Sequence, residues 1–249
     1  MILSDLHTHS FFCDGKDSPE QMIESAIQKG LKEIGVLVHS YTPFDTAYCV
    51  SIEGQSEFIT HMARLKEKYK GKIKVLCGVE QDVFSTTSIE GYDYCIGSSH
   101  YFLVDGEYYH VDYNPEYFIN LVNEKFDGDY YKAVESYYNN LLLVGKNFTP
   151  DIIGHFDLIT KFNEGDKLFS TTDTRYVEAR DRALNYLISL GKPFEINTGA
   201  ISRGYTTFPY PANNVIDAIK KAGGKLIISS DAHRKENVGF QFNEWQKLL

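Results

Sequence analysis

Short apolar runs alternate with amphipathic segments along almost the whole chain. A continuous apolar run between turn signals is typical of a strand buried on both faces. Seven segments are predicted as strands on this basis: residues 1–3, 34–38, 74–79, 94–99, 151–154, 192–197 and 225–229. The first of them precedes the polar run that begins at Asp5.

Helix signals occupy most intervals between these strands. Ser18, Pro19 and Gln21 give an N-cap, a proline at the first helical position and a capping box, and Gly30 gives the stop. The other expected helices are residues 54–69, 117–146 (one or two helices with a break near Gly128), 172–190, 211–222 and a final helix over 245–249. The aromatic segment 101–113 is expected to form a loop or hairpin over the site.

A strand followed by a helix, repeated about seven times, favours parallel strands in an α/β barrel or a doubly wound sheet. The length of 249 residues suits one barrel, which commonly has roughly 200–250 residues. The chain shows no linker and no low-complexity tract. We therefore expect residues 1–249 to form a single domain.

Composition narrows the possible roles. The chain is 43% hydrophobic, and no apolar run reaches the roughly 18 residues of a membrane span. A net charge of −9 argues against nucleic-acid binding, because phosphate backbones select for lysine and arginine. The chain starts without a basic segment and a long apolar one, so we expect a cytoplasmic protein. The four cysteines show no CxxC spacing.

Ionisable side chains follow the predicted strands with regularity. Residues i and i+2 share one face of a strand, so His7 and His9 point the same way, and we expect the same of Asp231 and His233. In parallel α/β barrels, active sites form at the carboxyl ends of the strands. Nine residues of metal-ligand type are expected there: His7, His9, Asp14, His39, Glu80, His100, His155, Asp231 and His233.

Nine ligand-type side chains exceed the set of about four to six that one ion uses. We therefore predict two or three divalent ions. Imidazole and carboxylate together suit zinc, iron or manganese. Glu80 is the expected bridge between two ions, and close ions can stabilise both the attacking and the leaving oxygen in a displacement at phosphorus.

Each candidate also has a structural interpretation, because a single histidine after a strand is more often a hydrogen-bonded packing residue. The joint pattern argues against that interpretation, since six of the eight histidines fit it. His61, on a predicted helix, is expected at the surface. His110 could touch a substrate, but we expect a plain residue of the aromatic segment.

A segment rich in small residues follows the strand over 192–197. Residues 197–204 read Asn-Thr-Gly-Ala-Ile-Ser-Arg-Gly, and we expect a loop that carries Arg203 to the face of the metal candidates. A planar guanidinium matches two phosphoryl oxygens, so Arg203 is predicted to bind a phosphate group. Its alternative role is a surface ion pair. Lys161, six residues after His155, is a second candidate cation.

On these residues the chain resembles the PHP (polymerase and histidinol phosphatase) superfamily. The matching motifs span the chain in order: Asp5-Leu6-His7-Thr8-His9, His39, Gly78-Val79-Glu80, Ser98-Ser99-His100, Gly154-His155 and Ser230-Asp231-Ala232-His233. Residues 154–159, and residues 194–198 followed by Arg203, resemble the stand-alone histidinol-phosphate phosphatases in particular. The resemblance implies a distorted (β/α)7 barrel with a trinuclear metal site at the C-terminal ends of its strands.

The resemblance also implies how the ligands divide among three ions. One ion would use His7, His9, Glu80 and Asp231, a second Glu80, His100 and His155, and a third Asp14, His39 and His233. Three positions depart from the family pattern: Val38 where many members carry an acidic residue, Asp14 where several have histidine, and Lys161 where some have arginine.

Three hypotheses follow for the function. The first is a metal-dependent phosphomonoesterase that hydrolyses a small molecule, L-histidinol phosphate, in histidine biosynthesis. Glu80, Asp231 and Arg203 would be catalytic, and Arg203 and Lys161 would bind the phosphate. The second keeps the superfamily but makes the chain a nucleotide phosphatase or a 3′–5′ exonuclease. The third is a non-catalytic metal-binding module; such modules usually lose ligands, whereas all nine positions here keep ligand-capable residues. The sequence gives no indication of oligomeric state.

Overall fold

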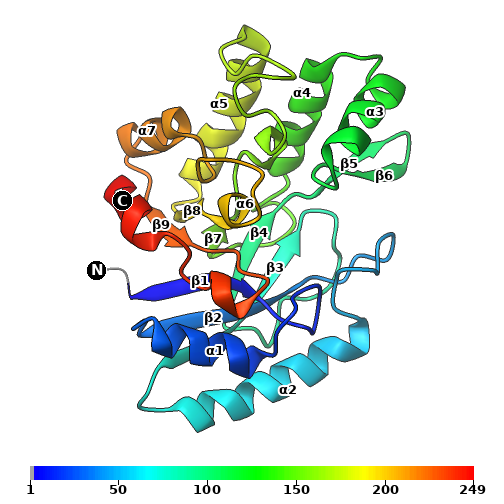
Figure 1. The fold of residues 1–249 in the computed structure, drawn as a ribbon. Helices are drawn as coiled ribbons and strands as arrows, with labels where there is room; N and C mark the ends of the chain where they lie inside the picture. Colours follow the sequence, from blue (N-terminus) through cyan, green and yellow to red (C-terminus); the bar gives the residue numbers. More distant parts are fainter. Residues whose placement is uncertain (1–2) are drawn as a thin grey trace.

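Seven parallel strands form one sheet that nearly closes into a barrel, with helices packed around it (Figure 1). The structure, a computed structural model, describes residues 3–249, so residues 1–2 of the first predicted strand lie outside the described residues. In sheet order the strands are β1 (Ser4–His9), β2 (Glu33–His39), β3 (Lys74–Asp82), β4 (Tyr94–Ser98), β7 (Ile152–Ile153), β8 (Phe194–Asn197) and β9 (Leu226–Ser229).

Strands β1 and β9 lie at the two ends of this order. Backbone hydrogen bonds connect the carboxyl end of β1 to the segment that follows β9. Thr8 pairs with Ala232 in an isolated parallel bridge. The His9 amide donates to the Ala232 carbonyl at 2.8 Å, and the Ala232 amide donates to the His7 carbonyl at 3.3 Å. This closure confirms the (β/α)7 barrel expected from the sequence, and it brings residues from both ends of the chain to one place.

The predicted helices are present with shifts of a few residues at their ends, except the last, which was expected over 245–249 and instead ends at Trp245, where a 3-10 helix follows. They are α1 (Pro19–Gln28), α2 (Ile52–Tyr69), α3 (Pro115–Lys125), α4 (Tyr130–Leu141), α5 (Thr174–Ser189), α7 (Asn213–Lys221) and α8 (Phe242–Trp245). Three short 3-10 helices are η1 (Leu158–Thr160), η2 (Lys235–Asn237) and η3 (Gln246–Leu248). The capping box at α1 is confirmed, because the Ser18 hydroxyl accepts from the Gln21 amide and the Gln21 side chain accepts from the Ser18 amide.

The expected break near Gly128 separates α3 from α4. Asp127 and Gly128 both have a positive φ, of 56° and 75°, which a helix does not allow. The aromatic segment over 101–113 forms an antiparallel hairpin of β5 (Tyr101–Val104) and β6 (Glu107–His110), as one of the two expected forms. The Asn140 side chain of α4 donates to the Tyr101 carbonyl at 3.0 Å and holds this hairpin against the barrel.

Two expectations about the ends of strands are wrong. The segment over 197–204 is not only a loop, because it contains the one-turn helix α6 (Gly199–Ser202). Asp231 and His233 do not alternate along a strand, since β9 ends at Ser229 and Asp231 has a φ of +48°. A left-handed residue reverses the backbone locally, so their shared direction comes from a turn.

Large apolar clusters lie between the sheet and the helices. One packs α1 and α2 on the first strands through Met22, Phe58 and Met62, and another packs α4 and α5 through Tyr138 and Tyr176. The barrel interior differs, because it holds buried polar side chains at its carboxyl end. The fold thus uses its outer layer for stability and leaves the strand ends for chemistry.

Candidate metal and phosphate site

The structure brings all nine predicted ligand candidates to one end of the barrel. They come from β1 (His7, His9), the turn after it (Asp14), β2 (His39), β3 (Glu80), the segments after β4 (His100) and β7 (His155), and the turn after β9 (Asp231, His233). This placement follows from parallel strands, whose carboxyl ends meet on one face of a barrel.

Glu80 lies at the centre of this group and is only 1% exposed. Its Oε2 faces three imidazole nitrogens, His7 Nε2 at 3.2 Å, His9 Nε2 at 3.3 Å and His39 Nδ1 at 3.1 Å. Its Oε1 faces His155 Nε2 at 2.8 Å and His100 Nε2 at 3.3 Å. One buried carboxylate therefore has five imidazoles around it.

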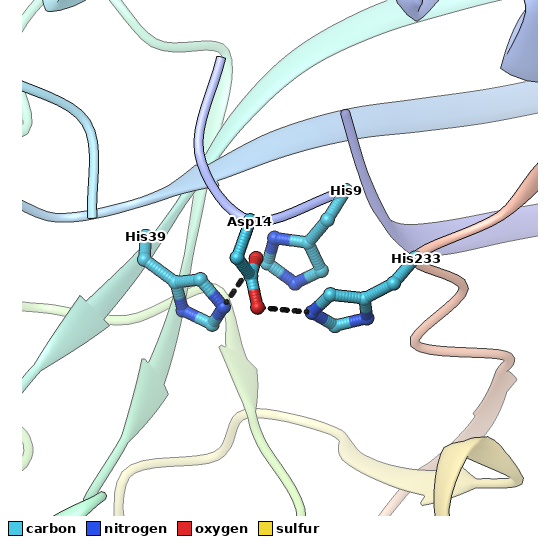
Figure 2. Close-up of side chains that lie close together, drawn as sticks. All are labelled: His9, Asp14, His39 and His233. Atoms are coloured by element: carbon cyan, nitrogen blue, oxygen red, sulfur yellow. Dashed lines mark ion pairs between the residues drawn. The ribbon is translucent and has the colours of Figure 1, made fainter. Parts of the chain in front are cut away.

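A second group surrounds Asp14, which lies between two imidazoles in Figure 2. Asp14 Oδ1 is 3.4 Å from His39 Nε2, and Oδ2 is 3.1 Å from His233 Nε2. The His9 ring stacks on the rings of His39 and His233, with centroids 4.2 Å and 4.4 Å apart. His9 and His39 therefore belong to both groups and connect them.

Asp231 links the cluster to Arg203. Its Oδ1 lies 3.5 Å from His7 Nε2 and 3.6 Å from His9 Nε2. Its Oδ2 accepts from Arg203 Nη2 at 2.9 Å, and its carbonyl accepts from Arg203 Nη1 at 3.1 Å. The left-handed turn at Asp231 thus gives one oxygen to the imidazoles and the other to the guanidinium.

Two carboxylates behind the imidazoles were not predicted. Glu195 on β8 faces His7 Nδ1 at 2.8 Å and accepts from the His155 amide at 2.6 Å. Asp82 on β3 faces His100 Nδ1 at 3.1 Å. A carboxylate on the second ring nitrogen fixes the tautomer and orientation of a metal-ligating histidine. Two signals in the sequence could have identified these carboxylates. Glu195 is a lone acidic residue inside an apolar strand, and Asp82 lies two residues after Glu80 on the same strand.

Charges within the cluster set its protonation. Burial alone would raise the pKa of the Glu80 carboxyl, but the charges of His7, His100 and His39 hold that pKa well below its usual range. Burial, helped by the charges of His39 and His233, lowers the pKa of His9 to about 3. Burial raises the pKa of the Cys13 thiol to about 12. The site therefore offers an ionised Glu80 and a neutral His9 imidazole, while Cys13 stays a thiol.

These residues fit divalent metal ions. His7 Nε2 and His9 Nε2 lie only 3.1 Å apart. Both nitrogens face the same two carboxylate oxygens, Glu80 Oε2 and Asp231 Oδ1. Asp14 Oδ1 and His39 Nδ1 are buried, and within residues 3–249 their nearest polar neighbours, 3.4 Å and 3.1 Å away, are not placed with hydrogen-bond geometry. An unpartnered buried polar atom costs free energy, and a cation that accepts its lone pair removes this cost.

Three sets of side chains each bring their ligand atoms within 4.8 Å of one another. They are His9, Asp14, His39 and His233; His7, His9 and Glu80; and His39, Glu80 and His100. Imidazole nitrogen and carboxylate oxygen together are the donors that zinc, iron and manganese accept. Several ions could therefore be held side by side.

The cluster opens into a cavity of about 680 Å³ that Arg203 and Lys161 also line. The Arg203 side chain is 30% exposed, and Lys161 is 8% exposed. Lys161 Nζ donates to the Asp112 carboxylate at 2.8 Å and to its carbonyl at 3.0 Å. Asp112 was not predicted, because the aromatic segment gave no signal that separates one of its acids from another.

The two remaining histidines lie outside the cluster of ligand candidates. His61 is half-buried, with its ring 5.5 Å from that of Phe12, so it is not a fully exposed residue of α2. His110 lines the cavity, and its Nε2 lies 3.0 Å from Asp45 Oδ2. The hairpin of β5 and β6 explains this position, because it folds the aromatic segment over the mouth of the barrel.

Within residues 3–249, no helix combines the length and the apolar character that crossing a membrane would require.

A (β/α)7 barrel with histidines and carboxylates gathered at the C-terminal ends of its strands defines the class of metal-dependent phosphoesterase barrels. The model of the PHP domain matches residues 5–199 of this chain. The chain therefore belongs to the PHP family.

Relatives of the chain share the name histidinol-phosphatase. A histidinol-phosphatase of Bacillus subtilis is 25% identical over 263 residues, which cover 96% of this chain and 96% of that protein. A probable histidinol-phosphatase of Schizosaccharomyces pombe is 26% identical over 264 residues, which cover 97% of this chain and 83% of that protein.

A solved structure shares the fold. It is the crystal structure of a histidinol phosphate phosphatase from Lactococcus lactis in complex with zinc, L-histidinol and phosphate. It superposes on this chain with a TM-score of 0.72 at 22% sequence identity, and the match covers 98% of this chain and 91% of that one.

Proposed function

We propose that this protein is a metal-dependent phosphomonoesterase that hydrolyses L-histidinol phosphate to L-histidinol and phosphate. The observation that carries the proposal is one cavity lined both by the cluster around Glu80 and by the cations Arg203 and Lys161. Family membership supports the reaction class. The name shared by the Bacillus subtilis and Schizosaccharomyces pombe relatives supports histidinol phosphate as the substrate.

We further propose that the nine clustered residues hold two or three divalent ions of zinc, iron or manganese. The division is the one expected from the family motifs: His7, His9, Glu80 and Asp231; Glu80, His100 and His155; and Asp14, His39 and His233. Three sets of converging ligand atoms support several ions in this cluster and share most of their members with this division, but they group His9 with Asp14 and His39 with Glu80. When bound, such ions supply Lewis acidity that neutralises charge developing on the phosphoryl oxygens.

Arg203 is suited to orient the phosphoryl group. A guanidinium carries five donors; two of those on Arg203 bind Asp231 and Nη1 also contacts His233 Nδ1 at 3.3 Å, so the remaining N–H groups are available for phosphoryl oxygens. The Asp231 carboxylate fixes the plane of the guanidinium before substrate arrives, which lowers the ordering cost of binding. Lys161 would add a point charge, with its position set by Asp112.

The positions of the last two ligand candidates bear on the domain organisation of the chain. The ligand candidates Asp231 and His233 lie beyond residue 199, where the match to the PHP model ends. Yet the bridge from Thr8 to Ala232 ties them to the first strand. We propose that residues 1–249 act as one domain, because the site is incomplete without its last segment.

Two rival functions lose support in the structure. A non-catalytic module is disfavoured because the ligand candidates converge and open into a cavity that Arg203 and Lys161 also line. No feature of the described residues favours a nucleic-acid chain over a small phosphomonoester as the substrate, and the net charge of −9 opposes it.

The test measures phosphate release and metal content together. The purified full chain, loaded with zinc, manganese or iron, is assayed on L-histidinol phosphate, on nucleoside monophosphates and on thymidine 5′-p-nitrophenyl phosphate as an exonuclease probe. We expect the highest kcat/KM on L-histidinol phosphate. His61→Ala is the matched histidine control and should retain activity and metal. A higher kcat/KM on either nucleotide probe would overturn the assignment of the substrate.

A further inference from the structure

Asp45 is a cavity carboxylate with no role in the proposed chemistry. Five carboxylates line the cavity: Asp14, Asp45, Glu80, Asp112 and Asp231. Three of them belong to the metal cluster, and Asp112 is paired with Lys161 at 2.8 Å. Within residues 3–249, no lysine or arginine lies within 4.0 Å of the Asp45 carboxylate, whose only ion-pair partner there is His110.

The Asp45 carboxylate is held in place by uncharged donors. Its Oδ2 accepts from the Tyr101 hydroxyl at 2.9 Å, and its Oδ1 accepts from the Ala47 amide at 3.3 Å. His110 Nε2 lies 3.0 Å from Oδ2 and gives the carboxylate a third hydrogen-bonding neighbour. The carboxylate is 15% exposed, and no lysine or arginine of residues 3–249 pairs with it.

The segment that carries Asp45 is fastened to the hairpin above the cavity. Phe44 stacks on Tyr108 of β6 with ring centroids 3.7 Å apart. Asp45 itself bonds to Tyr101 of β5. The connection after β2 and the hairpin thus form one wall of the cavity, with the carboxylate on it.

Asp45 and Arg203 line the cavity from different strands of the barrel. Arg203 follows β8, and Asp45 follows β2. In the sheet order, β1 and β9 separate these strands in one direction, and β3, β4 and β7 separate them in the other. Because both residues line one cavity from strands that are not neighbours, a substrate bound at Arg203 meets the Asp45 carboxylate at another part of the cavity wall.

We propose that Asp45, positioned by Tyr101 and His110, binds the positively charged part of the substrate and makes the enzyme selective for cationic phosphomonoesters. This inference rests on the proposed function, since it assumes that phosphate binds at the cluster. A buried carboxylate without a cation partner is stabilised by an ammonium or imidazolium group from the ligand, and a neutral ligand leaves its charge uncompensated. Selectivity then comes from the wall rather than from the metal cluster.

The test is Asp45→Asn, which keeps the shape and an oxygen acceptor for Tyr101 but removes the charge. We expect kcat/KM on L-histidinol phosphate to fall about tenfold or more, the range for a lost hydrogen bond to a charged group. Turnover of p-nitrophenyl phosphate, which lacks a cation, should change less than about twofold. Inhibition by the cationic alcohol L-histidinol should weaken in parallel, while inhibition by inorganic phosphate should not.

Phe44→Leu is the matched control, because it loosens the same wall without changing its charge. It should alter both substrates by similar factors if Asp45 acts through its charge. Equal losses on both substrates in Asp45→Asn, or no loss on either, would overturn the inference and leave a purely structural role. If the parent enzyme itself does not hydrolyse L-histidinol phosphate, the proposed function fails first, and the inference fails with it.

Discussion

The two halves of the metal cluster are neighbours with different surroundings. The Glu80 centre (His7, His9, Glu80, His100, His155 and Asp231) is enclosed, with Glu80 1% and His7 0% exposed. The Asp14 centre (Asp14, His39 and His233) opens to solvent, with Asp14 32% and His233 22% exposed.

Their supporting residues differ in the same way. Glu195 and Asp82 stand behind His7 and His100 of the Glu80 centre and fix their rings. At the Asp14 centre, the residue before His39 is Val38, which cannot accept a hydrogen bond from an imidazole. Because outer carboxylates orient ligands and raise their basicity, we expect ions in the Glu80 centre to bind more tightly than the ion in the Asp14 centre.

The largest effect is expected from Glu80→Gln. An amide cannot supply the charge that Glu80 presents to five imidazoles, so metal content and activity should both be lost. Loss of several kcal/mol of transition-state stabilisation corresponds to about three decades or more in kcat. Metal analysis and kinetics on L-histidinol phosphate measure both results. Full activity, or an unchanged metal content, would remove Glu80 from its bridging role.

Asp14→Ala tests whether the exposed centre is separable. We expect the loss of about one ion per chain and a fall in turnover of about a hundredfold, the upper range for disturbing a metal site without abolishing it. The other ions should stay bound, because the Glu80 centre keeps its ligands. Metal content per chain, measured after dialysis, is the readout, and His233→Ala should give the same pattern. Loss of all ions together would show that the two centres form one cooperative unit.

Arg203→Ala should affect neither centre's metal content. The guanidinium is not a ligand, but a charged hydrogen bond to phosphate contributes roughly 1.5–3 kcal/mol, or about one to two decades in kcat/KM. Arg203→Lys should recover part of this, because lysine supplies a charge without the planar fork. A kcat/KM within about twofold of the parent in Arg203→Ala, far short of the expected loss, would exclude Arg203 from phosphate binding.

The smallest effect is expected from Cys13→Ser. Cys13 Sγ lies 3.5 Å from His9 Nδ1, between the two centres, but it belongs to none of the sets of converging ligand atoms. Metal content should be unchanged, and kcat/KM should stay within about twofold, as for a change beside a site that alters no ligand. Release of an ion from this variant would make the thiol a ligand shared by both centres.

Much of the fold could be predicted from the sequence because its signals are local. Apolar runs marked the strands, and Ser18 with Gln21 marked the start of α1. The alternation that places His7 and His9 on one face holds, since both belong to β1 and both face Glu80. The same argument failed for Asp231, because no apolar pattern reveals a left-handed turn after a strand has ended.

The partners behind the site could not be predicted in the same way. Glu195 bonds to His7 across 188 positions of sequence, and Asp82 approaches His100 across 18. Nothing near Lys161 indicated that Asp112 would hold it, and nothing near His110 indicated Asp45. Each of these pairs joins two segments that other strands or helices separate in the sequence.

The sequence by itself determined which side chains stand at the ends of the strands, and thereby the donor types and the end of the barrel where they meet. Local periodicity suffices for this, because it sets the face and direction of each strand. Only the tertiary structure decided which imidazole faces which carboxylate, which centre is enclosed and which wall of the cavity is acidic. These depend on closure of β1 on β9 and on the packing of the hairpin. A hydrogen bond a few ångströms long can be located only once distant segments have been placed.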